Sequence, residues 1–134
     1  MIVWGGYDGV NVVSSGARYI PGASSWTATP ASGAPAPRFA QSGVWTGTEL
    51  LVWGGESTAP NTTASFFTDG GRYNPTANQW AAITSQGAPA GRAAHTANWT
   101  GNEMLVWGGG SGAGNFNDTS GYTAPRLVYL YQRP

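Results

Sequence analysis

The sequence predicts an all-β fold made of small antiparallel sheets that repeat along the chain, and three observations support this prediction. A short apolar run that ends in two glycines occurs three times, at residues 2–6, 51–55 and 105–109. The second and third runs are 54 residues apart. Between them lie short apolar stretches bounded by glycine and proline, as β-strands are. A repeat of about 50 residues with this content is typical of β-propeller blades.

The same offset of 54 residues holds at other positions, most of them aromatic or charged. It links Arg18 with Arg72, Tyr19 with Tyr73, Trp26 with Trp80, Arg38 with Arg92, Trp45 with Trp99, and Glu49 with Glu103. Because every tryptophan recurs at one position of the repeat, we interpret these side chains as packing residues. The first and last of these charged pairs are expected to tie strands together through charge-assisted hydrogen bonds.

The composition argues against several classes of partner. Only 9% of the 134 residues are charged, lysine is absent, and six arginines balance six carboxylates. Attraction to nucleic acid or to an anionic membrane is therefore not expected. The chain has no cysteine and one histidine, so we predict neither a metal site nor a cofactor. No export signal is recognised and no apolar run approaches the roughly 18 residues of a membrane span, and the compartment stays unassigned.

The first repeat unit is expected to contain three strands. Residues 1–4 are apolar on both faces, which indicates a strand covered on both sides and ended by the diglycine. A polar loop is predicted over residues 7–15, followed by strands at 16–19 and 25–29. Residues 30–37 contain three prolines and are expected to form a stiff connector.

The second unit adds a strand in front of these three. It is predicted over residues 38–45, and a tight turn around Gly47 leads into the strand at 50–53. A loop is predicted over residues 56–69. It has 14 residues against nine in the first unit, and such tolerance of length indicates an exposed loop. Further strands are expected at residues 71–75 and 79–83.

The third unit repeats this pattern with strands at residues 92–99 and 104–107, but its end allows two registers. In one, residues 127–131 form the final third strand. In the other, Tyr122 lies opposite Tyr19 of the first unit and Tyr129 lies opposite Trp26, because the spacings from the tryptophan of the apolar run are equal.

The glycine pair, followed by a tyrosine and a tryptophan with six residues between them, resembles the kelch repeat. Two copies match well and a third, at Gly108-Gly109, matches more weakly. The residues that carry the resemblance, or share its repeat positions, are Trp4, Gly5, Gly6, Tyr19, Trp26, Trp53, Gly54, Gly55, Tyr73, Trp80, Trp107, Gly108 and Gly109. The resemblance implies four-stranded antiparallel propeller blades, of which the chain supplies strands two to four, then one to four, then one to three.

We therefore predict a single kelch-like unit over residues 1–134, with part-blades at 1–29 and 92–134 and a full blade at 38–83. A closed propeller needs roughly four to eight blades, and about two and a half are present. The end sheets are expected to expose Trp4 and Trp107, which predicts that a homodimer closes a ring of five or six blades. The alternative is a fragment of a larger propeller.

Candidate binding residues lie at the strand entries and in the loops. The resemblance places the strands that Arg38 and Arg92 open at the channel mouth, where the arginines either hold a carboxylate ligand or have a structural role. His95 corresponds to Gln41, which indicates a structural polar position rather than a general base. The loop aromatics either bind a partner or cap the ring or the subunit contact, and they are Tyr7, Phe66, Phe67 and Phe116.

These features favour a non-catalytic binding or scaffold module with a protein or peptide partner. The first alternative is a glycan-binding, lectin-like propeller in which the loop aromatics stack on sugar rings. The second is a fragment of a larger kelch enzyme, since the resemblance includes oxidases and sugar epimerases. Enzymatic activity is not predicted, because neither a serine triad nor a pair of repeated carboxylates is present in the pattern.

Overall fold

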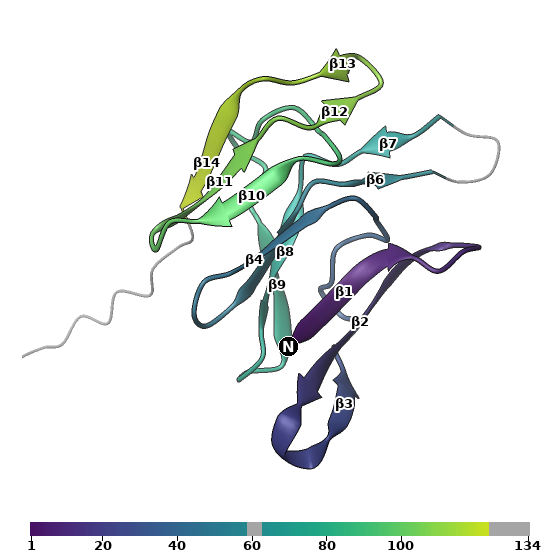
Figure 1. Ribbon diagram of the computed structural model, residues 1–134, viewed down its shortest axis with the longest axis vertical. Coiled ribbons are helices and arrows are strands. Elements are labelled where there is room, and N and C mark those ends of the chain that lie inside the picture. The colour runs from purple at the N-terminus through teal and green to yellow at the C-terminus, as the bar shows by residue number, and fades with distance from the viewer. Residues whose placement is uncertain (59–62, 124–134) are drawn as a thin grey trace, which may run out of the picture.

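The computed structural model describes residues 1–58 and 63–123, and it contains three main antiparallel sheets that follow one another along the chain (Figure 1). The first consists of β1 (Ile2–Tyr7), β2 (Val12–Ile20) and β3 (Ser25–Ala28), with a 3-10 turn at Pro21–Ala23. The middle sheet consists of β4 (Ser42–Trp45), β5 (Leu50–Trp53), β8 (Gly70–Asn74) and β9 (Gln79–Ile83). The third consists of β10 (Thr96–Trp99), β11 (Glu103–Trp107) and β14 (Thr119–Thr123).

This architecture confirms the prediction of an all-β fold built from kelch-like blades. The middle sheet has the order β4-β5-β8-β9, and no sheet closes on itself within the described part of the chain. In this sheet the Arg72 guanidinium lies 3.7 Å from the Glu49 carboxylate and ties neighbouring strands, as expected for the repeated charged positions. No described residue belongs to a helix long and apolar enough to cross a membrane. That residues 1–134 form a single unit with the stated blade boundaries stays a prediction.

The diglycine does not end the first strand, and the loop predicted over residues 7–15 is wrong. β1 continues to Tyr7, which pairs with Val12, and the register shifts between Trp4 and Gly6. Gly5 and Gly6 have φ of +68° and +112°. Backbone of this kind forms a bulge, which re-aims a strand without stopping it. The connection is therefore only residues 8–11.

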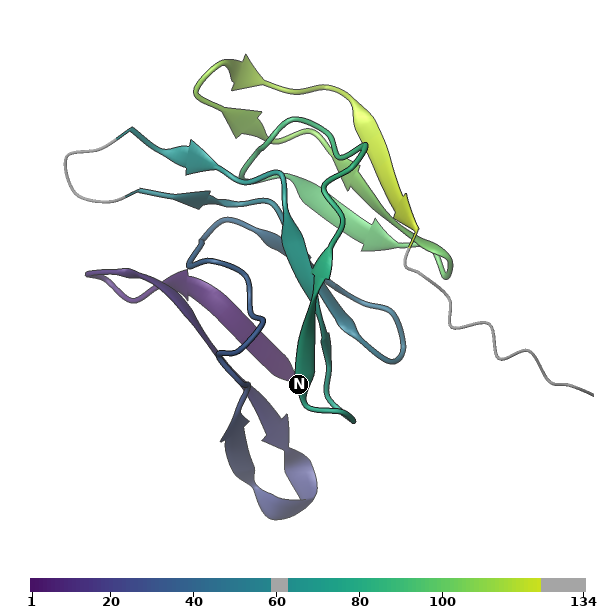
Figure 2. The ribbon, with the colours of Figure 1, turned by 180° about the vertical axis from the view of Figure 1, so that it is seen from behind.

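The other two diglycines are also followed by hairpins rather than by plain loops. β6 (Glu56–Ser57) pairs with β7 (Ser65–Phe66), and β12 (Gly110–Ser111) pairs with β13 (Gly114–Asn115). The prediction of a loop over residues 56–69 therefore missed a small hairpin. Figures 1 and 2 show the two hairpins and the β1–β2 turn projecting toward the same side of the molecule.

The first strands of the middle and third blades begin later than predicted. The expected strands at 38–45 and 92–99 start at Ser42 and Thr96, because Ala40 and Ala94 have φ of +52° and +54° and turn the chain there. The residues before each turn make a separate bridge to the hairpin, Phe39 to Glu56 and Ala93 to Gly110.

The third strand of the last blade is β14 and not residues 127–131, so that interpretation is wrong. Tyr122 of β14 pairs with Met104, as Tyr73 pairs with Leu50 in the middle sheet. The observed register is therefore the second of the two predicted registers, in which Tyr122 corresponds to Tyr19 of the first unit. Residues 127–131, including Tyr129, lie outside the described residues.

The core lies between neighbouring sheets and forms two clusters. One lies between the middle and third sheets and consists of Val44, Leu51, Trp53, Ile83, Met104 and Val106. The other joins the first and middle sheets and consists of Trp4, Val52, Tyr73 and Trp80. Trp4 is 8% exposed because its ring packs 5.3 Å from that of Trp80, so the prediction that the end sheet exposes Trp4 is wrong.

Candidate functional site

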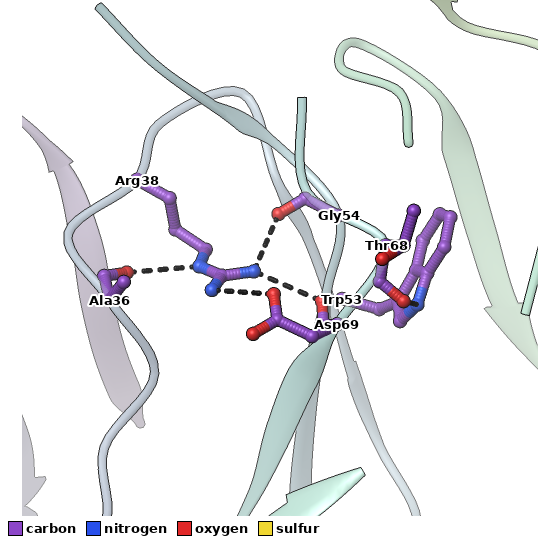
Figure 3. A network of polar contacts seen from close by, with 6 residues as sticks. All are labelled: Ala36, Arg38, Trp53, Gly54, Thr68 and Asp69. Carbon is purple, nitrogen blue, oxygen red and sulfur yellow. Dashed lines mark hydrogen bonds and ion pairs between the residues drawn. The ribbon is translucent and has the colours of Figure 1, made fainter. Parts of the chain in front are cut away.

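Arg38 is fully buried, and its side chain connects three segments of the middle blade by hydrogen bonds (Figure 3). Its Nε donates to the carbonyl oxygen of Ala36 at 3.0 Å, and Nη1 donates to the carbonyl oxygens of Gly54 and Asp69 at 3.1 and 3.0 Å. Its Nη2 donates to the Asp69 carboxylate at 2.9 Å. The guanidinium carbon lies 4.0 Å above the centre of the Phe67 ring. The network therefore joins the connector, the diglycine and the start of β8.

Arg92 repeats this arrangement in the third blade. It is 1% exposed, and it donates to the carbonyl oxygens of Ala90 and Gly108 and to both carboxylate oxygens of Asp118. Its guanidinium carbon lies 4.1 Å above the Phe116 ring. The hydrogen bond and the charge of Arg92 hold the pKa of Asp118 below its ordinary value. The planar guanidinium group is well suited to contact both oxygens of a carboxylate.

The two networks give the arginines a structural role within the chain. The carboxylates that Arg38 and Arg92 hold are Asp69 and Asp118 of the same blades, so the geometry offers no support for capture of a carboxylate ligand by these side chains. Sequence reasoning did not pair them, because the two aspartates lie 31 and 26 residues further along the chain in segments of unequal length.

Successive blades are joined where the diglycine of one blade contacts the residues just before the first strand of the next blade. We call each such place a diglycine seat. At the first seat, the Gly6 N–H donates to the Arg38 carbonyl oxygen at 2.8 Å, and Gln41 Nε2 donates to the Trp4 carbonyl oxygen at 3.1 Å. A Cβ on Gly5 would lie 2.7 Å from Gln41 Nε2, so a larger residue would displace this side chain, and the φ of +68° also favours glycine.

The second diglycine seat is built in the same way around His95. The Gly55 N–H donates to the Arg92 carbonyl oxygen at 2.8 Å, and His95 Nε2 lies 2.7 Å from Ser42 Oγ. The imidazole packs edge-on against Trp53 with 5.2 Å between ring centres. His95 and Gln41 therefore have equivalent roles at two junctions, which supports the structural interpretation of this position.

Burial, with a smaller contribution from the charge of Arg92, lowers the pKa of His95 to about 4. Because the unfolded chain titrates near 6.5, it binds a proton in the window between pH 6.5 and 4 that the folded chain does not bind. The free energy of unfolding should therefore fall on acidification through this window, by up to about 3 kcal/mol. Urea unfolding across this pH range should show the loss.

The His95→Gln variant is the matched control, since glutamine occupies the equivalent place at the first seat. Carboxylate titrations are common to both proteins, so the test is the difference between their stabilities as a function of pH. A difference that stays constant between pH 7 and 4 would show that His95 titrates normally in the folded chain.

The loop aromatics predicted as binding residues do not form one cluster. Tyr7 is 60% exposed and its ring lies 6.2 Å from that of Phe39. Phe66 is half-buried in β7, and Phe67 and Phe116 each have one face covered by a buried arginine. Sequence reasoning missed Val10, an apolar side chain 76% exposed at the β1–β2 turn. Its signal was an apolar residue directly after Asp8-Gly9, within a turn.

The model of the KLHDC2/KLHL20/DRC7 kelch-repeats domain matches residues 1–126. The chain belongs to the kelch-repeat family. Kelch-repeat domains are β-propeller modules that generally serve protein interaction rather than catalysis. No curated protein matches the sequence of this kelch chain.

Proposed function

We propose that this kelch chain is a non-catalytic interaction module that associates with a second copy to complete a propeller ring and presents its hairpin side to a protein or peptide partner. The proposal depends on one observation, the difference in burial at two of the three tryptophan positions of the repeat; at the third, Trp45 of the middle sheet is 47% exposed and Trp99 packs against the core. Trp53 is 3% exposed but Trp107 is 59% exposed, and Trp80 is 8% exposed but Trp26 is 49% exposed.

The difference follows from the position of each blade. The middle sheet has a neighbour on both sides, whereas Trp107 belongs to the third sheet and Trp26 to the first. Covering an indole contributes about 2 kcal/mol by apolar area, so the two exposed side chains favour association of one end sheet with the other. Head-to-tail association places the third sheet of one copy beside the first sheet of the next, and a ring of two copies closes.

The hairpin side is the proposed partner surface. The β1–β2 turn, β6–β7 and β12–β13 project together, so three successive blades contribute to one surface (Figures 1 and 2). Tyr7 and Val10 are its exposed aromatic and aliphatic side chains. Tyrosine gives a large contact area together with a hydroxyl group, and such residues are enriched where peptides and proteins bind.

Light scattering of the wild-type chain should give twice the mass of the chain. The Trp26→Ser and Trp107→Ser variants should each weaken association at least tenfold, because each removes about 2 kcal/mol of apolar burial at every contact. Peptides that bind the wild-type protein can be selected from a displayed random library. The Tyr7→Ser variant should associate normally but should no longer bind these peptides.

Ring closure and the partner surface can each be contradicted by a separate result. A folded monomer at micromolar concentration would contradict ring closure by a second copy and favour a fragment of a larger propeller. Peptide binding that is indifferent to Tyr7→Ser would contradict the assigned partner surface. Saturable binding on a glycan array would instead support the lectin-like alternative.

A further inference from the structure

No residue within 1–58 or 63–123 occupies the third diglycine seat, formed by Gly108 and Gly109, whereas the first two seats are occupied; we call this third seat open. Their φ values of +67° and +82° match those of Gly54 and Gly55, +69° and +87°, so the backbone is already in the conformation of an occupied seat. A Cβ on Gly108 would meet only the Phe116 carbonyl oxygen, at 3.5 Å. An open pocket of about 480 Å³ lies here and is bordered by the exposed Trp107.

The polar groups that bind the incoming segment at the second seat have equivalents at the third. The Gly55 N–H, which binds the Arg92 carbonyl oxygen, corresponds to the Gly109 N–H. At the second seat the Ala40 carbonyl oxygen accepts from the Ala94 N–H at 2.9 Å. The equivalent acceptor at the third seat is the carbonyl oxygen of Ala94. Among residues 1–58 and 63–123, neither the Gly109 N–H nor the Ala94 carbonyl has a hydrogen-bond partner.

A third contact also has its counterpart. At the second seat Ser42 Oγ lies 2.7 Å from the imidazole of His95, and the residue equivalent to Ser42 is Thr96. Thr96 is exposed at the start of β10 and carries the same hydroxyl group. The third seat therefore offers a donor, an acceptor and a hydroxyl in the arrangement that holds residues 92–95 at the second.

The occupied seats define the chemistry of the occupant. In both, the carbonyl oxygen of the first residue of a four-residue segment, Arg38 or Arg92, accepts a hydrogen bond from the N–H of the second glycine. The third residue is an alanine with positive φ, and the fourth is glutamine or histidine, whose side chain lies against the first glycine. The arginine side chain turns back into its own blade, so it does not contribute to recognition at the seat.

We propose that the open seat at Gly108-Gly109 is a binding site for a short segment of another polypeptide that turns at a small residue followed directly by glutamine or histidine. This inference rests on the proposed function in that both require the third sheet to be covered by protein. It goes beyond that function by naming the sequence that the seat selects. The recognised groups are the backbone of the segment and one polar side chain.

The test uses a synthetic peptide with the sequence of residues 90–97 and the full chain carrying Trp26→Ser, which leaves the third seat intact and weakens association with the competing copy. Titration followed by amide NMR should shift the Gly109 N–H and the Trp107 indole N–H saturably, with a Kd on the order of 1 mM or tighter. Replacing the peptide histidine by glutamine should preserve binding, and replacing it by alanine should weaken binding at least fivefold.

The Gly108→Ala variant should lose the peptide, because its Cβ takes the place of the imidazole, as a Cβ on Gly54 would lie 2.7 Å from His95. Gly114→Ala is the matched control, since Gly114 also has a positive φ, +123°, and no atom lies within 4 Å of its Cβ. Absence of saturable shifts, or shifts that persist in Gly108→Ala, would overturn the inference. Failure of ring closure appears separately, as a monomeric mass of the wild-type chain.

Discussion

Replacing Arg38 by alanine should lower the free energy of unfolding by about 3–5 kcal/mol, the largest single effect that we expect in this chain. The side chain is fully buried, and its removal leaves the carbonyl oxygens of Ala36 and Gly54 without their donor. It also uncovers one face of Phe67. Buried acceptors that lose their partners cost more than the original bonds contribute. Urea unfolding followed by tryptophan fluorescence measures the loss.

The Asp69→Asn variant is the control for this experiment. Its side chain is 52% exposed, and the backbone oxygen of residue 69 still accepts from the guanidinium. Because the asparagine oxygen and the backbone carbonyl oxygens can still accept from the guanidinium, the loss should be clearly smaller than that of Arg38→Ala. Equal losses in the two variants would mean that Arg38 acts as a surface ion pair and not as a buried fork.

The second large effect is expected from replacing Gly54 by alanine, at about 2–4 kcal/mol. Its φ of +69° costs an L-residue roughly 1–2 kcal/mol. The new Cβ would also lie 2.7 Å from His95 and 2.9 Å from the Arg92 carbonyl oxygen. Since the second contact is with backbone, relief requires the neighbouring blade to move, and such overpacking costs about 1–3 kcal/mol more.

The chain provides its own comparison for this substitution. Gly108→Ala has almost the same φ, +67°, but its Cβ meets no atom closer than 3.5 Å. It should cost only the backbone part, about 1–2 kcal/mol. The difference between the two variants therefore measures the contact between blades, and equal losses would show that the junction adjusts freely. Thermal or urea unfolding of both variants in parallel is the measurement.

The local repeat made much of the fold predictable. The apolar runs, the tight turn at Gly47 and the spacing from Tyr73 to Trp80 identified the strands of the middle sheet, because each strand depends on residues close to it in sequence. The errors occurred where a residue has two roles. A diglycine reads as a strand end, which is correct for β5 and β11, but Gly5-Gly6 forms a bulge within β1, and the other two diglycines are followed by small hairpins.

The candidate site was less predictable than the fold. Arg38 and Arg92 were recognised as unusual, but their partners were not, because Asp69 and Asp118 are brought to them only when strand three pairs with strand two. Val10 was missed because a single apolar residue after Asp8-Gly9 does not by itself indicate that its side chain is exposed. Its exposure depends on the shape of the β1–β2 turn.

The sequence by itself determined the blade repeat, the positions of its glycines and tryptophans, and the resemblance to kelch proteins, since these depend on local spacing. From the number of blades it also predicted that Trp107 is exposed, which the structure confirms, and that Trp4 is exposed, which the structure contradicts. Only the tertiary structure decided that Trp4 is covered by Trp80, and that described residues occupy two diglycine seats but not the third. The physical reason is that burial depends on a neighbouring sheet, and a repeated sequence does not say which of its copies have one.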